Sequence, residues 1–273
     1  MSFQPDYAFD GEPPLGETWE VAPGVRWLRM PLPFKLNHIN LWMLEDGDGW
    51  TLVDTGINTE ETRAAWDRVF ENTLGGKPVT RIIVTHFHPD HVGLAGWLAA
   101  RFKVPLWMPY TEWATGRMLS FETSESAGPV SHAFYKAAGF TGERLDQVER
   151  READPLARFL DSLKRFKDLP ADTLVLPSHN WPFRGLLERL DDLAAHHVER
   201  LDAAQTACAA RDGDGGATAV DVLEHLFKRE MDTHQMFFAI GESLAHLHHL
   251  MTLGRVRRSV DAAGVYRYQA AAV

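Results

Sequence analysis

The segment Thr85–His91, with the sequence THFHPDH, places three histidines and one aspartate within seven residues. It follows the apolar run Arg81–Val84, so the histidines begin where a buried strand is expected to end. Residues two positions apart project to the same side of an extended segment, so His86 and His88 can bind one ion from a single strand end. The spacing therefore predicts a metal position at the end of this strand.

The second half of the segment points to a neighbouring position. Pro89 fixes its own φ angle and biases the residue before it away from helix, so Asp90 and His91 lie past a turn. Imidazole and carboxylate ligands without a thiolate favour zinc, and iron or manganese are alternatives. A structural core would have to satisfy each of these polar groups separately, which disfavours a purely structural role. We therefore expect one or two metal ions at this loop, Thr85–His91, which is termed the metal loop.

Two further stretches carry a family resemblance. VDTG at Val53–Gly56 precedes the histidine segment, and LPSHN at Leu176–Asn180 follows it. Together with the HxHxDH pattern, they resemble the metallo-β-lactamase-fold hydrolases, a superfamily that includes glyoxalase II-like and β-lactamase-like hydrolases. The similarity extends over nearly the whole chain. It implies an α/β fold of the αββα sandwich type, with the metal loop at the carboxyl end of a strand.

The same resemblance implies roles for individual residues. His179 would complete the second metal position with Asp90 and His91. Asp90 would also orient the nucleophile, which makes it the candidate catalytic residue. Asp54, in the VDTG stretch, would support the metal loop from behind the ligands, because metal-bound histidines commonly donate their free N–H to such a carboxylate.

Two ligands of the family pattern are not found in the sequence. Between His91 and His179, the family places a third histidine in a GHTPG- or GHSPE-like stretch and a bridging aspartate in a GD-like stretch. This interval contains one histidine, His132, in a different sequence context. One ion is therefore expected at the second position, and two ions only if another side chain is recruited. The candidates for recruitment are His132, Asp146, Glu149 and Asp154.

Hydrophobic patterning places these residues on a series of elements. Early β-rich runs predict an antiparallel start to a sheet, and a helix begins at Asn58–Thr59 and ends near Leu74. The predicted strands are Val25–Met30, Ile39–Leu44, Trp50–Val53, Arg81–Thr85, Val104–Trp107 and Thr173–Leu176. Two later helices are predicted to begin at His91 and at Pro155. The other predicted helices span Thr111–Ser120, His132–Gly139, Gly185–Arg211, Ala219–Lys228 and Phe237–Leu253, and a short hairpin ends the chain.

Few strands are predicted after the metal loop, which indicates a reduced second sheet with the missing part near Gln147–Asp154. We expect a metallo-β-lactamase-like domain over residues 1–210, in which residues 110–150 form a helical insertion or lid. The RDGDGGA stretch after residue 210 marks a boundary, and residues 211–273 are expected to form a small C-terminal helical, winged-helix-like appendage. His132 in the insertion and His234 in the appendage are candidate substrate-side residues, with surface or packing roles as alternatives.

The chain has 273 residues and a formal net charge of −10, which argues against nucleic acid as a partner, because phosphate binding depends on clustered Lys and Arg. The N-terminal stretch has neither a basic nor an apolar signal region, and no run of about 18 apolar residues occurs. A cytoplasmic location without a membrane partner is the expectation. Cys208 lies in a helical pattern among alanines, which favours a small buried hydrophobe. The oligomeric state is left open.

These features together favour a zinc-dependent hydrolase with a small-molecule substrate. A bound metal lowers the pKa of water to about 7, so a nucleophile becomes available at neutral pH to attack an ester, thioester, lactone or related bond. The alternative is a catalytically impaired or non-catalytic metal-binding relative, because two family ligands are not found. A nuclease using the same metal chemistry is disfavoured by the charge balance.

Overall fold

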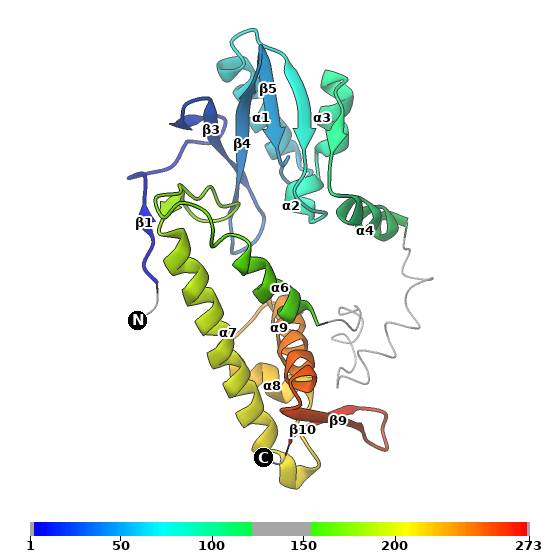
Figure 1. The fold of residues 1–273 in the computed structure, drawn as a ribbon. Coiled ribbons are helices and arrows are strands. Elements are labelled where there is room, and N and C mark those ends of the chain that lie inside the picture. The colour runs from blue at the N-terminus through cyan, green and yellow to red at the C-terminus, as the bar shows by residue number, and fades with distance from the viewer. Residues whose placement is uncertain (1–2, 122–153, 272–273) are drawn as a thin grey trace. The chain divides into compact units, whose positions relative to one another are not determined.

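The computed structural model describes residues 3–121 and 154–271 (Figure 1). The chain divides into two compact units. The first, termed the sheet unit, comprises Pro5–Glu122 and Leu174–Arg184. The second, termed the helical unit, comprises Met1–Gln4, Thr123–Thr173 and Gly185–Val273. Each unit has a hydrophobic core of its own.

The sheet unit is built on a six-stranded mixed sheet with the strand order β2-β3-β4-β5-β6-β7. Strands β2 to β5 pair antiparallel, whereas β5 with β6 and β6 with β7 pair parallel. Parallel neighbours need a crossover connection, which helices supply on either side of β6. The strands span Trp19–Ala22 (β2), Val25–Pro31 (β3), His38–Asp46 (β4), Gly49–Val53 (β5), Val79–Ile83 (β6) and Leu106–Trp107 (β7).

Helices α1 (Glu60–Thr73) and α3 (Ala95–Phe102) cover one face of this sheet. The Thr59 side chain caps α1 by accepting a hydrogen bond from a first-turn N–H, as its residue type predicts. Alternate residues of β3, β4 and β5 point toward these helices. The side chains that are fully buried in this core include Leu28, Leu41, Leu52, Trp66 and Leu98.

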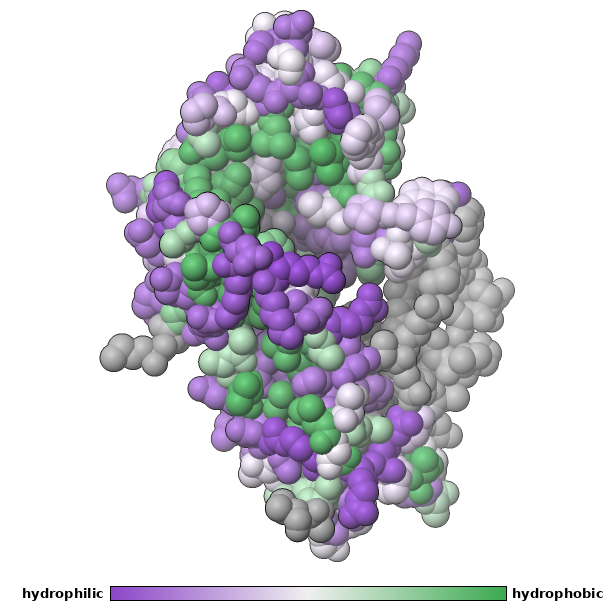
Figure 2. Space-filling model, viewed as in Figure 1, coloured by the Kyte–Doolittle hydropathy of each residue, from purple (hydrophilic) through white to green (hydrophobic). Residues whose placement is uncertain are grey.

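The opposite face of the sheet carries aromatic side chains. Trp27 and Trp42 stack across β3 and β4 with their ring centroids 6.3 Å apart, and toward the β7 edge Trp107 is 53% exposed. Figure 2 shows hydrophobic residues at the surface over the strands of this unit. Within its described residues, the sheet unit contains the six-stranded sheet and the pair of β1 (Asp6–Tyr7) with β8 (Phe183–Arg184). This arrangement confirms the α/β class. The missing part of the second sheet was expected near Gln147–Asp154, and residues 147–153 lie outside the described residues.

Three predicted elements around the metal loop need correction. The strand predicted as Arg81–Thr85 ends at Ile83, because the Thr85 N–H donates to the Asp54 carboxylate. The helix predicted from His91 divides into α2 (Pro89–Val92) and α3, because the Leu94 N–H donates to Thr55 Oγ1. The strand predicted as Thr173–Leu176 is wrong, since Val175 forms only an isolated bridge with Phe183. The predicted helix Thr111–Ser120 is confirmed as α4 (Tyr110–Phe121), and His132–Gly139 lies outside the described residues.

In its described residues, the helical unit packs four α-helices and a hairpin around one core. These elements are α6 (Pro155–Lys164), α7 (Leu186–Ala209), α8 (Ala219–Leu226), α9 (Thr233–Thr252), β9 (Val256–Val260) and β10 (Tyr266–Ala270). Strands β9 and β10 pair antiparallel, which confirms the predicted terminal hairpin. Buried side chains from α7, α8, α9 and β10 meet in the core, among them Leu201, Val222, Leu247 and Tyr268. None of the helices in the described parts of the chain is long and apolar enough to cross a membrane.

The division between the two units differs from the expected boundary at residue 210. Helices α6 and α7 precede that boundary but belong to the helical unit. The physical reason is the shared core, in which Leu156 of α6 and Leu201 of α7 are buried with residues of α8 and α9. The sheet unit in turn takes up Leu174–Arg184, the segment that carries His179.

Candidate metal centre

The metal loop begins at the carboxyl ends of two parallel neighbours, β5 and β6. Asp54 follows β5 directly with a φ of 61°, a left-handed conformation that Asp tolerates better than most residues. Its N–H donates to the Ile83 carbonyl at 2.8 Å, and its carboxylate accepts from the Thr85 N–H at 2.8 Å and from Thr85 Oγ1 at 2.9 Å. Asp54 is 2% exposed. It therefore fixes the first residue of the metal loop.

The same carboxylate orients a histidine. His91 lies in α2 and is 2% exposed, and its Nδ1 lies 2.7 Å from Asp54 Oδ2. The carboxylate accepts a hydrogen bond from Nδ1–H. Nε2, on the side of the ring away from Asp54, is then the nitrogen available to a metal ion. The turn after α2 is tight, because a side chain at Gly93 would come within 2.4 Å of the Pro89 carbonyl oxygen.

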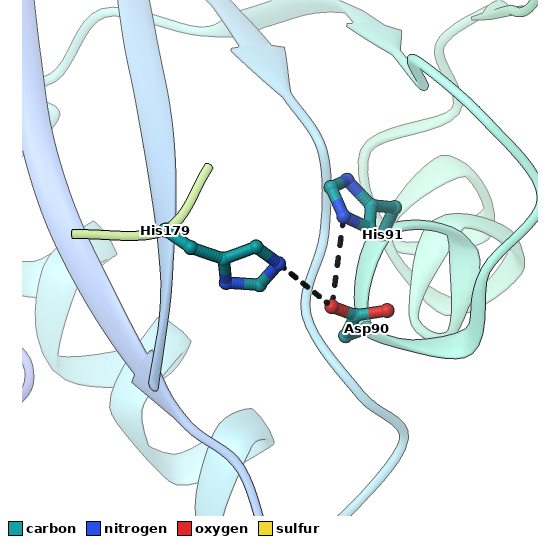
Figure 3. Close-up of side chains that lie close together, drawn as sticks. All are labelled: Asp90, His91 and His179. Carbon is teal, nitrogen blue, oxygen red and sulfur yellow. Dashed lines mark ion pairs between the residues drawn. The ribbon is translucent and has the colours of Figure 1, made fainter. Parts of the chain in front are cut away.

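The side chains of Asp90, His91 and His179 converge on one point (Figure 3). Asp90 Oδ2 lies 3.5 Å from His91 Nε2 and 3.7 Å from His179 Nε2. Ligand atoms that lie about 2.1 Å from one tetrahedral zinc ion are about 3.4 Å apart, so these spacings fit a shared cation. In the two described stretches, these three residues make up the one group of at least three potential ligands within 4.8 Å of one another.

His179 comes from the segment after Val175 rather than from a helix or strand. Its Nδ1 lies 3.3 Å from the His38 carbonyl oxygen, which can only accept a hydrogen bond. Nδ1 therefore carries a proton, and Nε2, on the Asp90 side, is the nitrogen available to a metal ion. Both histidines of the group thus have their second nitrogen held by an acceptor, an arrangement typical of metal-bound histidines.

His86 and His88 form a pair beside this group. His86 Nε2 and His88 Nδ1 lie 3.0 Å apart, and the His86 ring centroid lies 3.8 Å from that of His91. Burial, together with the neighbouring imidazoles, lowers the pKa of His86, and burial also lowers the pKa of His88. Both rings are therefore neutral at pH 7 and can offer a lone pair. The pair could hold a second ion next to the first.

Of the other sequence candidates, Asp154 has a described side chain, and it makes its contacts elsewhere. Asp154 caps α6 in the helical unit, where it accepts from the Ala157 N–H and from His249 Nδ1. His132, Asp146 and Glu149 lie outside the described residues. His234 lies in the first turn of α9, and the structure describes its backbone but not its side chain.

Sequence reasoning missed two residues of the sheet unit. Glu112 of α4 accepts from the Phe87 N–H at 3.3 Å, which places a carboxylate against the segment between His86 and His88. Asn40 lies within the apolar strand β4 and is 1% exposed. A polar residue inside an apolar strand needs buried partners, so the run HINLWML contained a usable signal for Asn40. No comparable signal marks Glu112.

Comparisons with known proteins identify the family. The family model of the metallo-beta-lactamase superfamily matches residues 35–154 of the sequence. The family model of the metallo-beta-lactamase-like C-terminal domain matches residues 201–271. A beta-lactamase domain protein from Burkholderia ambifaria, of known crystal structure, is 36% identical with a TM-score of 0.84. That alignment covers 98% of this chain and 97% of the Burkholderia chain. The chain belongs to the metallo-β-lactamase superfamily.

Two further relatives are matched over part of their length. The probable metallo-hydrolase YqjP of Bacillus subtilis (strain 168) is 32% identical over 68 residues, which are 24% of this chain and 21% of that protein. The beta-lactamase-like protein 2 homolog of Caenorhabditis elegans is 26% identical over 195 residues, which are 62% of this chain and 65% of that protein. The chain thus spans less than two thirds of the length of both relatives.

Proposed function

We propose that this protein is a zinc-dependent hydrolase that cleaves an ester, thioester, lactone or related bond in a small molecule. The observation that carries the proposal is the convergence of Asp90 Oδ2 with the Nε2 atoms of His91 and His179. Membership of the superfamily supports metal-assisted hydrolysis, and one relative is named a probable metallo-hydrolase. The formal net charge of −10 favours a small-molecule substrate over nucleic acid.

Each side chain has a distinct task in this proposal. His91 and His179 bind the ion through Nε2, while Asp54 and the His38 carbonyl keep Nδ1 protonated. Asp90 binds through one carboxylate oxygen and orients the attacking water with the other. When bound, zinc supplies a water of lowered pKa and polarises the carbonyl under attack.

The number of ions depends on the His86–His88 pair. Two imidazoles leave a position with fewer protein ligands than the three usual at catalytic zinc. We propose that the group of Asp90, His91 and His179 binds the tighter ion and that the histidine pair binds a weaker one. Iron or manganese would suit the same ligands.

The experiment is a panel of chromogenic ester, thioester and lactone substrates, assayed with added zinc and again after removal of metal by chelator. We expect zinc-dependent turnover of at least one class, loss of turnover and of the tighter ion in Asp90→Ala, and loss of turnover and of the weaker ion in His88→Ala. The exposed His196 offers a matched control outside the site, so His196→Ala should keep wild-type turnover. Chelator-resistant turnover, or full activity of Asp90→Ala, would refute the proposed metal-dependent mechanism. Metal binding without turnover of any substrate would instead support the non-catalytic alternative.

A further inference from the structure

The side chain of Asn40 links strands β3 and β4 to the segment that carries His179. Its Oδ1 accepts a hydrogen bond from Trp27 Nε1 at 2.9 Å. Its Nδ2 donates to the Pro177 carbonyl at 2.9 Å and also to the Asn180 carbonyl. An indole N–H can only donate and a carbonyl can only accept, so these partners fix the orientation of the amide.

The backbone of β4 adds two bonds to the same segment. The Asn40 N–H donates to the Ser178 carbonyl at 2.7 Å, and the His38 carbonyl accepts from His179 Nδ1. Strand β4 therefore holds residues 177–180 at four points, two of them from the Asn40 side chain. Asn180 adopts a φ of 67° directly after His179, so this turn has no regular secondary structure to hold it.

We infer that Asn40 is a positioning residue for the metal centre: it fixes the backbone on both sides of His179 and so places Nε2 opposite Asp90. This inference rests on the proposed function. In this role Asn40 acts through the carbonyls of Pro177 and Asn180 and not as a metal ligand.

The amide is chemically specific for this task. In Asn40→Asp, a second oxygen would replace Nδ2 and face two carbonyl oxygens that it cannot bond. The buried carboxylate would keep the bond from Trp27 but repel the segment. The matched control is Trp27→Phe, which removes the indole donor from the same buried network and leaves both Nδ2 bonds in place.

The test is cobalt(II) titration of the full chain, followed by the visible absorption of the bound ion. We expect Asn40→Asp to bind cobalt about ten- to a hundredfold more weakly than wild type, the range found when groups that orient metal ligands are removed. Trp27→Phe should lower thermal stability but change cobalt affinity by less than about threefold. Because Asn40 acts through His179, adding Asn40→Asp to His179→Ala should cause no further loss of affinity.

The outcomes separate the two proposals. The positioning role is wrong, and the proposed function stands, if Asn40→Asp binds cobalt as tightly as wild type. The same holds if the double variant loses as much cobalt affinity as the two single variants together. If wild type binds no cobalt, both are wrong. Should Asn40→Asp fail to fold, Asn40→Ala removes both donors without adding a charge and supports the same comparison.

Discussion

Asp54 and His91 form a buried carboxylate–imidazole pair, with 2.7 Å between Oδ2 and Nδ1 and with each side chain only 3% exposed. The carboxylate also accepts two hydrogen bonds from Thr85, so three donors surround it. Such a carboxylate fixes the tautomer of a histidine and raises the basicity of its other nitrogen. One residue at the end of β5 thereby determines both where the metal loop begins and how His91 presents Nε2.

The first prediction follows from these three donors. Asp54→Asn keeps the shape of the side chain but turns an N–H₂ group toward at least one donor. We expect zinc affinity to fall about ten- to a hundredfold, measured by competition with a chromogenic chelator. Asp46→Asn is the control, because Asp46, the last residue of β4, also accepts hydrogen bonds from two threonine hydroxyls, those of Thr51 and Thr80. Equal zinc affinities for the two variants would contradict the role of Asp54.

The second prediction concerns the pH dependence of stability in the helical unit. His246 is 1% exposed, its Nδ1 lies 2.7 Å from the Glu242 carbonyl, and its Nε2 lies 3.1 Å from His197 Nδ1. Burial lowers the pKa of His246, and Arg200, His196 and His249 add to the effect, while the bond to Glu242 opposes it. The folded state therefore keeps the ring neutral, whereas the unfolded state takes up a proton below about pH 6.5.

It follows that the free energy of unfolding is highest above about pH 6.5 and decreases as the pH falls. Urea unfolding at about pH 7.5 and about pH 5.5 measures the decrease, which should be larger for wild type than for His246→Gln. His225→Gln, a change of an exposed histidine on α8, should retain the wild-type dependence. A His246→Gln protein with an unchanged pH dependence would show that His246 is not the group responsible.

The third prediction concerns Cys208, the one cysteine of the chain. The side chain is fully buried in the core of the helical unit, and burial raises the pKa of its thiol to about 12, with a contribution from Asp212. Thiolate is the reactive form, so the native thiol should resist a disulfide reagent at about pH 8 and react fully after unfolding in guanidinium. Val198→Cys places a thiol at an exposed position of the same helix and should react quickly. Comparable rates at both positions would contradict the buried environment.

Local patterns predicted helices α1 and α7 well, whereas α9, expected from Phe237, begins at Thr233. Helix α1 was expected between Thr59 and Leu74 and spans Glu60–Thr73, because a capping threonine and two glycines mark its ends. Helix α7 was expected over Gly185–Arg211 and spans Leu186–Ala209. The errors at the metal loop arose where tertiary hydrogen bonds override local preference. Strand β6 ends two residues early because Thr85 bonds to Asp54, and neither partner is marked by the pattern of the strand itself.

The candidate site was predictable to a different extent. The spacing of His86, His88, Asp90 and His91 indicates a metal loop without any reference to a fold. The contribution of His179 came from the family resemblance, because its distance from His91 in the sequence carries no geometric information. Asn40 and Glu112 were missed because their roles depend on backbone groups of distant segments. Such contacts arise only once β4 and α4 are placed.

The central claim is that Asp90, His91 and His179 bind a catalytic metal ion. Its most direct test is the metal content of protein purified without chelator, determined by elemental mass spectrometry for wild type and for the double variant Asp90→Ala/His179→Ala. We predict at least about one equivalent of zinc, or of iron or manganese in its place, in the wild type and loss of that ion in the variant. Less than about half an equivalent in the wild type, after supply of zinc during growth, would contradict the claim.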